Sequence, residues 1–276
     1  MRFPYWLVPI FSATVWLAML LAMLLTWVVD GKPHLPTMDV GQVVPFISDI
    51  GAWKMKPVFI AMGTVTVVSF DLAFISERWL RHRGKLTPNT SVWQKTFAVI
   101  SIIASVVGAA GLILLTIFDA LHHPNVHDIC LVLFIGGYVV SAIFVCAEYQ
   151  RLGIHYRQFR ILRISFWIKL AFILIEVGLA IGFGVATTNN NNHRNTAGIF
   201  EWVVALVYSF YVMSYFLDFL PAFSKNGQTM TTEEMAMQDS AAPYAGRERY
   251  DGGALPYQNQ DAYSSRYAQQ TRGWRV

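Results

Sequence analysis

Six apolar blocks, each about as long as a membrane-spanning helix, constrain the fold of this chain more than any other feature. A helix rises about 1.5 Å per residue, so roughly 20 residues cross the ~30 Å hydrocarbon core of a bilayer. Runs such as FAVISIIASVVGAAGLILLTIF lack the alternation of apolar and polar residues that strands of a membrane β-barrel require. The sequence therefore predicts an all-α polytopic membrane protein, a bundle of six transmembrane helices at about 5–29, 57–76, 95–118, 128–148, 164–186 and 199–220.

The composition agrees with a membrane protein, and it changes abruptly near the C-terminus. Hydrophobic residues make up 55% of the 276 residues and charged residues only 14%, whereas an average soluble domain carries about 25% charged residues. We expect residues 1–223 to form one membrane domain. Residues 224–276 are rich in Gln, Ser, Gly and Tyr, and they hold too little apolar surface to offset the entropy of ordering. The sequence predicts a disordered cytosolic tail there.

Lysine and arginine gather in two of the short loops, which predicts the orientation in the membrane. The opposite loops carry little positive charge, apart from a long first loop. Both termini are therefore expected in the cytoplasm, where the basic loops would contact anionic lipids of the inner leaflet. No motif for nucleic acid is visible, so no such partner is expected. The cytosolic basic residues are Arg78, Arg81, Arg83 and Lys85 after the second span, and Arg151, Arg157, Arg160 and Arg163 after the fourth.

Four ionisable residues fall within the predicted spans: Asp71, Lys169, Glu176 and Asp218. Such groups are costly in hydrocarbon and mark functional or packing sites. Lys169 is expected to extend its ammonium group to the cytosolic lipid headgroups. For Glu176, a hydrogen bond to a neighbouring helix and a role towards a lipid or an ion both remain open.

Small residues spaced four apart predict places where helices approach closely. These pairs are Gly178 and Gly182, Ala104 and Gly108, and Gly137 and Ser141.

The segment DALHHPNVHD between the third and fourth spans carries three histidines and two aspartates. Such a set could hold zinc with an open position for water. However, Pro124 prevents His123 and His127 from sharing one continuous helix, as a metal site of the HExxH type requires. Capping of the fourth span, with Asp128 at the positive end of the helix dipole, is the better explanation. We therefore predict no metal, cofactor or catalytic residue, although the sequence does not exclude an enzyme.

The segment PFISDIGAWKMKP before the second span is stiff and polar. Pro45 and Pro57 restrict the backbone at its two ends. Ser48 and Asp49 can accept backbone N–H bonds in a turn, and Gly51 permits a left-handed backbone angle. We predict a rigid cap on the outer membrane face. It could close the mouth of the bundle or hold a lipid headgroup, and the chemistry of the residues leaves both alternatives open.

This segment resembles the hallmark of the Frag/DRAM/Sfk family of six-span membrane proteins. The stretch VHD at the start of the fourth span and the last span, GIFEWVVALVYSFYVMSYFLDF, are also similar to that family. The resemblance covers roughly residues 1–223 and implies an outer-face motif for structure or for lipid-headgroup contact. The residues of this motif are Pro45, Ile47, Ser48, Asp49, Gly51, Pro57, His127, Asp128, Glu201 and Trp202.

The long polar tail is similar to that of the fungal FK506-suppressor, or Sfk-like, members of the family. That resemblance implies a non-catalytic protein of the plasma membrane, which supports phosphoinositide 4-kinase action and phospholipid organisation. A cytosolic lipid-kinase complex would then be a partner of the tail. Two alternatives remain: a factor for GPI-anchor lipid remodelling on the luminal face of Golgi or ER membranes, and an autophagy modulator of an endolysosomal membrane.

Overall fold

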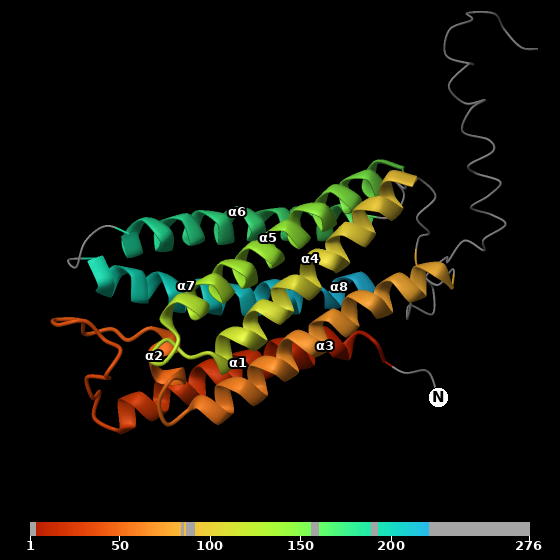
Figure 1. Cartoon of the computed structure of the whole chain (residues 1–276). Coiled ribbons are helices and arrows are strands. Elements are labelled where there is room, and N and C mark those ends of the chain that lie inside the picture. Colours follow the sequence, from red (N-terminus) through yellow and green to blue (C-terminus); the bar gives the residue numbers. More distant parts are fainter. Residues whose placement is uncertain (1–3, 84–85, 87–91, 156–159, 189–192, 221–276) are drawn as a thin grey trace, which may run out of the picture. The chain divides into compact units, whose positions relative to one another are not determined.

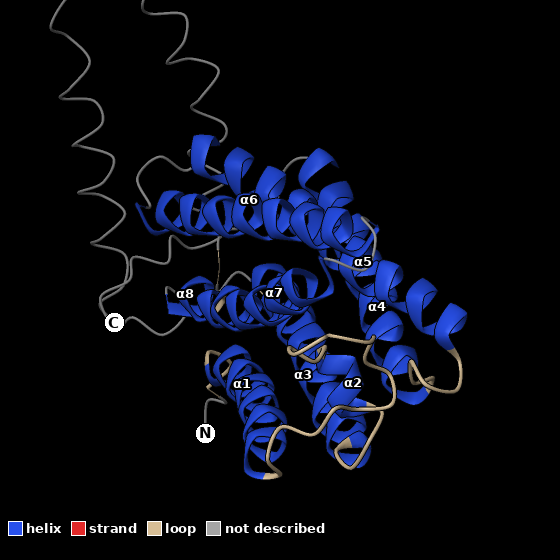
Figure 2. Cartoon of the chain, turned by 90° about the vertical axis from the view of Figure 1, so that its left-hand side faces the viewer, coloured by secondary structure: helices blue, strands red, loops and turns tan. Residues whose placement is uncertain are grey.

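The computed structural model describes residues 4–83, 86, 92–155, 160–188 and 193–220, and in these residues it contains helices and loops but no strand (Figures 1 and 2). The predicted tail at 224–276, Lys85 and Arg157 lie outside the described residues. The helices are α1 (Leu7–Val29), α2 (Ile47–Gly51), α3 (Lys56–His82), α4 (Val92–Ile117), α5 (Pro124–His155), α6 (Arg160–Thr188), α7 (Arg194–Ser214) and α8 (Phe216–Phe219).

Six of these helices are long and apolar enough to cross a membrane, which confirms the predicted fold class. Several extend beyond the apolar blocks, because charged residues continue the helix. The helix α3 runs to His82 rather than to residue 76, and α5 runs to His155 rather than to residue 148. The additional turns of α3 carry Glu77, Arg78 and Arg81, which pair with one another. The apolar pattern in the sequence ends at such residues, whereas the helix continues beyond them.

The long helices contact one another in a closed ring, as the view in Figure 2 illustrates. Along the chain, α3 packs against α4, α4 against α5, α5 against α6 and α6 against α7, while α1 packs against both α3 and α7. Two buried bonds fasten α1 into the ring. The Trp16 indole N–H donates to the carbonyl of Ala205 on α7 at 2.8 Å, and the Ser12 hydroxyl donates to the carbonyl of Thr66 on α3 at 2.8 Å.

The closest approach of two helices is that of α4 and α5, where glycines replace side chains. A Cβ atom at Gly137 would lie 2.6 Å from the backbone nitrogen of Gly108 and 2.8 Å from the carbonyl oxygen of Ala104. The predicted packing of these small residues is confirmed. The α6 pair behaves differently: a Cβ at Gly182 would meet the Phe200 ring of α7 at 2.9 Å, but Gly178 faces open space. The contact within the bundle that the spacing predicts is therefore not observed at Gly178.

An aromatic cluster occupies the interior of the ring. The fully buried Phe70 ring packs edge-on against the rings of Phe74, Tyr208 and Tyr215, with centroid distances of 4.9 to 6.4 Å. Edge-to-face pairs of this kind add roughly 0.5–1.5 kcal/mol each beyond the burial of area. They also fix how α3 faces α7.

The two ends of the bundle differ in character. We call the end that carries α2 and the loop between α1 and α3 the cap end. The end where α3 and α5 finish, and where α4 and α6 begin, carries most of the arginines, and we call it the basic end.

Candidate functional site

The short helix α2 forms within residues 45–57, the segment that the sequence predicts to be stiff. The Phe46 backbone N–H donates to a carboxylate oxygen of Asp49 at 2.7 Å, which satisfies a donor that the first turn would otherwise leave free. The Asp49 side chain is buried within the cap. This burial raises the pKa of Asp49, although the bond from Phe46 and the positive charge of Arg194 act in the opposite direction.

The cap is attached to the start of α7 by side chains from both segments. The Ile47 N–H donates to Glu201 Oε2 at 2.8 Å, and Trp202 Nε1 donates to the carbonyl of Pro45 at 2.9 Å. About two turns earlier, Asn195 Oδ1 accepts the backbone N–H groups of residues 43 and 44 at 2.7 and 2.9 Å. Two family-like stretches that lie about 150 positions apart in the sequence therefore form a single structure.

Gly51 serves this structure by its small size. The expected left-handed backbone is not observed at this position, because Gly51 is helical, and among the described glycines only Gly31 and Gly41 have positive φ. A Cβ at Gly51 would lie 2.4 Å from the Phe59 ring of α3. The glycine lets α2 lie directly against the first turn of α3, which begins around Pro57.

His127 and Asp128 belong to a different part of the cap end. His127 is buried, and its Nδ1 lies 3.0 Å from the carbonyl oxygen of Phe118 and 3.2 Å from that of Leu115, so it fastens the start of α5 to the end of α4. Asp128 is exposed just after the first turn of α5, which itself holds no acidic residue. Among the described residues, no hydrogen bond or ion pair joins His127 or Asp128 to Asp49 or Glu201. The ten motif residues are therefore not joined by one network of polar contacts.

Asp119 lies in the loop before α5, and its carboxylate has several partners. Its carboxylate accepts a bond from the Lys56 ammonium group at the start of α3, and it accepts the backbone N–H of His122 at 2.8 Å. Burial alone would raise its pKa, but these bonds and the charge of Lys56 outweigh burial and hold the pKa of Asp119 well below its usual range. Where side chains are described, no three His, Cys, Asp or Glu residues come together as a metal site would require.

A cavity of about 110 Å³ lies inside the bundle, directly beneath the cap. Ile47 of α2 and Glu201 of α7 form part of its wall. Most of the lining is aliphatic or aromatic, and Glu176 of α6 is the other acidic residue. No sequence pattern indicated this cavity, because its lining residues come from α1 to α7.

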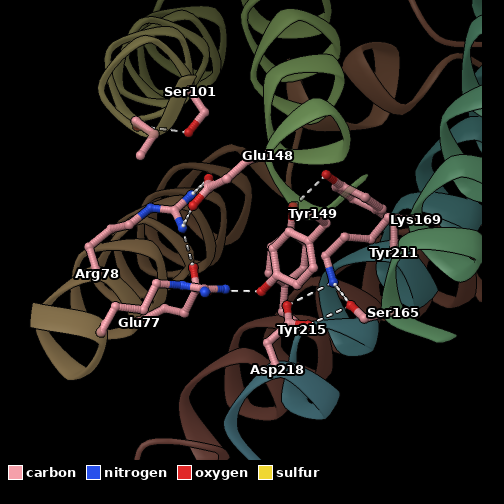
Figure 3. A network of polar contacts seen from close by, with 12 residues as sticks. Glu77, Arg78, Ser101, Glu148, Tyr149, Ser165, Lys169, Tyr211, Tyr215 and Asp218 are labelled. Atoms are coloured by element: carbon pink, nitrogen blue, oxygen red, sulfur yellow. Dashed lines mark hydrogen bonds and ion pairs between the residues drawn. The ribbon is translucent and has the colours of Figure 1, made fainter. Parts of the chain in front are cut away.

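At the basic end, two of the predicted loop arginines lie inside the bundle (Figure 3). Arg78 pairs with Glu148 of α5 at 2.6 Å, and Arg81 pairs with Glu77 at 2.6 Å. The Tyr149 hydroxyl donates to Glu77 at 2.8 Å. Arg78 is therefore a structural charge that joins α3 to α5, whereas Arg81 pairs with an acid of its own helix. The expectation that they lie in a loop for contact with lipid headgroups is wrong.

Lys169 lies deep in the bundle beside this network (Figure 3). It is 0% exposed, and its ammonium group donates to Asp218 at 2.7 Å and to Ser165 at 2.6 Å, while its charge lies 4.3 Å from the Tyr215 ring centroid. The expectation that Lys169 extends to the headgroups is wrong, since its partner lies 49 positions later in α8. Sequence spacing gave no sign of this pair.

The two remaining intramembrane acids differ in their partners. Asp71 of α3 accepts a hydrogen bond from the Ser105 hydroxyl of α4. Glu176 has a buried carboxyl oxygen, Oε1, without a hydrogen-bond partner among the described residues.

The other described arginines of the predicted basic loops are exposed at the basic end. None of them forms an ion pair with an acid in the part of the chain that the structure describes. Arg83 lies 4.5 Å from the Trp79 ring centroid, and Arg151 lies 5.4 Å from that of Phe97. Since Glu77, Glu148 and Asp218 are used inside the bundle, they do not neutralise this surface. The exposed arginines are Arg83, Arg151, Arg160 and Arg163.

The fold and the cap thus define a six-helix membrane bundle whose first loop is bound to its last span. Comparison with known sequences assigns the class: the Frag1/DRAM/Sfk1/Cwh43P N-terminal domain matches residues 4–222, and the chain belongs to this family. The predicted resemblance is confirmed.

Two curated relatives are of the Sfk type. The chain is similar to protein sfk1 of Schizosaccharomyces pombe, with 32% identity over 216 residues, which cover 78% of this chain and 64% of that protein. It thus spans less than two thirds of that relative. It is also similar to protein SFK1 of Saccharomyces cerevisiae, with 22% identity over 277 residues and 77% of each chain covered. No solved structure matches the chain.

Proposed function

We propose that this protein is a non-catalytic membrane protein that supports phosphoinositide 4-kinase action and phospholipid organisation at the plasma membrane, with both termini in the cytoplasm. The observation that carries the proposal is the charge of the basic end. There the acids are buried in ion pairs, whereas Arg83, Arg151, Arg160 and Arg163 are exposed. Each such cation near an anionic leaflet contributes roughly 1 kcal/mol of attraction.

The proposal gives the basic end and the tail separate tasks. The exposed arginines concentrate anionic lipids, including phosphoinositides, beside the bundle. The polar tail, which follows the described residues, recruits the soluble kinase complex. The Sfk type of the curated relatives supports this assignment, because the resemblance to the Sfk-like members is what implies the proposed role.

The test uses full-length protein with Arg83, Arg151, Arg160 and Arg163 changed to Gln, in cells that lack their own relative of the family. We expect plasma-membrane phosphatidylinositol 4-phosphate, followed with a fluorescent sensor, to fall several-fold while the surface amount of the protein stays normal. The matched control changes Lys32 and Lys54 at the cap end to Gln. An unchanged sensor signal in the arginine variant contradicts the proposal. A second chain ending at Phe223 tests the tail by the same measurement.

One observation favours a second candidate, GPI-anchor lipid remodelling at the cap. Asp49 and Glu201 meet there, and carboxyl groups can perform acid–base chemistry. Both groups, however, accept backbone N–H bonds of the cap. If this candidate is correct, Asp49→Asn will abolish remodelling in a protein that is present at normal level with a normal unfolding temperature.

A further inference from the structure

The cavity beneath the cap lies where α5 and α6 separate. Figure 1 shows these helices close together at the basic end and farther apart towards the cap end. The wall residues of α5 come from its first half, such as Leu131 and Val139, and those of α6 from its middle, Ile173 and Glu176. The cavity therefore lies at the depth of the hydrocarbon core, between the cap and the aromatic cluster.

The cavity is accessible from the lipid side. The helix α6 is the least covered span, with 11% of its apolar window buried compared with 33–44% for the other spans. On α5, the wall residues Leu131, Ile135 and Val139 are only half-buried. A ligand for this cavity would therefore enter sideways from the bilayer rather than from water.

Besides the hydroxyls of Tyr138 and Tyr208, Glu176 is the group in this wall with a buried polar atom that lacks a hydrogen-bond partner among the described residues. It stands 16 residues after the start of α6, about 24 Å along the helix, and thus near the middle of the span. Its Oε1 atom is buried without a hydrogen bond from any described residue. An unsatisfied buried polar atom costs on the order of 1–3 kcal/mol, and ionisable groups at this depth mark functional sites. The remaining wall, which includes Trp16, Phe134 and Tyr208, is mostly apolar.

We propose that this cavity binds a hydrocarbon segment of a neutral, hydroxyl-bearing membrane amphiphile, whose hydroxyl group donates a hydrogen bond to Glu176. The site is independent of the kinase-related role proposed above. A volume of about 110 Å³ is somewhat smaller than the ~150 Å³ of an engineered apolar cavity that admits benzene. It therefore takes a few carbon atoms and the attached hydroxyl, while the rest of the molecule stays in the bilayer.

Depth and charge select the hydroxyl group over other polar groups. A phosphate would have to carry its negative charge into hydrocarbon, and the lining of the cavity includes no Lys or Arg to pair with it. An ammonium group would have to cross hydrocarbon as a charge, at a much higher cost than a single hydroxyl. A neutral amphiphile with a small polar group reaches the middle of the span most easily.

The test compares two photoreactive lipids in phosphatidylcholine vesicles that hold the full-length wild-type protein. One is a diacylglycerol with a diazirine in its acyl chain, and the other is its methyl ether, which lacks the hydroxyl donor. We expect the diacylglycerol to label the walls of α5 and α6 about tenfold more than the ether, as found by mass spectrometry of the labelled peptides. Equal labelling by the two lipids overturns the proposal, since the cavity would then take any acyl chain.

Variants identify the recognising group. Glu176→Leu should reduce labelling by the diacylglycerol to the level of the ether, whereas Glu176→Gln, which keeps an acceptor oxygen, should retain most of it. Leu174→Phe is the matched control, because Leu174 is 65% exposed on the same helix and lies outside the cavity. Full labelling of Glu176→Leu overturns the assignment of Glu176. The comparison of the two lipids needs no variant, so it stands even if Glu176→Leu does not fold.

Discussion

Lys169 and Asp218 lie 2.7 Å apart with 1% of each side chain exposed, although 49 positions separate them in the chain. The Ser165 hydroxyl completes the arrangement by donating to Asp218 at 2.5 Å. This contact joins α6 to the short helix after α7. It places a full positive charge in the interior, where only a matched acid makes it tolerable.

Removal of one partner of this pair should be far more damaging than removal of both. Asp218→Leu leaves the Lys169 ammonium group buried without its acid, and we expect a loss of about 3–5 kcal/mol in unfolding free energy. The double variant Lys169→Met, Asp218→Leu should recover most of that loss, because two apolar side chains then pack together. Thermal unfolding in mild detergent measures both variants against the wild type. A double variant that is less stable than Asp218→Leu contradicts this account.

Gly51→Ala should loosen the cap. The new Cβ would lie 2.4 Å from the Phe59 ring, and overpacking of this kind typically costs about 1–3 kcal/mol. We expect faster hydrogen exchange of the backbone amides of α2 and the first turn of α3. The matched variant adds Phe59→Leu, which makes room for the methyl group and should restore protection. If Gly51→Ala exchanges like the wild type, the close approach of α2 and α3 is not limiting.

Trp202→Phe should weaken the attachment of the cap to α7. The substitution removes the bond that Trp202 Nε1 donates to the Pro45 carbonyl at 2.9 Å, and it leaves the ring largely in place. A lost hydrogen bond of this type costs about 0.5–1.5 kcal/mol. Limited proteolysis of the loop between α1 and α3 should become several-fold faster. Trp167→Phe is the control, because that tryptophan is 61% exposed on α6; equal proteolysis of the two variants would contradict the assignment.

Lowering the pH should show how much Asp119 contributes to the stability of the folded form. Its pKa in the folded chain lies below the ordinary value of 3.8, because the bonds from Lys56 and His122 outweigh the effect of burial. The folded form therefore gains stability above about pH 4, and this gain is lost as the pH falls from there towards the lower folded value. The unfolding temperature of the wild type should fall more between pH 5 and pH 2.5 than that of Asp119→Asn. Parallel falls would show that the Lys56–Asp119 pair does not contribute.

The bundle could be predicted from the sequence, because hydrocarbon leaves a chain few alternatives. Apolar blocks of about 20 residues must become helices whose backbone groups bond within the segment. The ends of these helices could not be predicted in the same way. Charged residues such as Glu77 and Glu148 end an apolar pattern, yet they lie in α3 and α5, where Arg78 of α3 forms an ion pair with each of them.

The candidate sites also differ in how much of each could be predicted from the sequence. The cap could be anticipated from its prolines and its Ser-Asp-Ile-Gly turn, and the resemblance to a family linked it with Glu201 and Trp202. The pairing of Arg78 with Glu148 and that of Lys169 with Asp218 depend on which helices become neighbours, which spacing along one segment does not encode. The cavity depends on the angle between α5 and α6, and no local signal reports that angle.

The bond between Trp16 and Ala205 has a consequence for biogenesis. The two residues are 189 positions apart, so at a synthesis rate of roughly 5–20 residues per second the indole waits about 10–40 s for its acceptor. In the finished bundle the first span packs against the second and the last spans. During that interval only the second span of these two is present. A ribosome-bound chain that ends before the last span should therefore depend on insertion chaperones, and premature stop codons there should send the product to degradation.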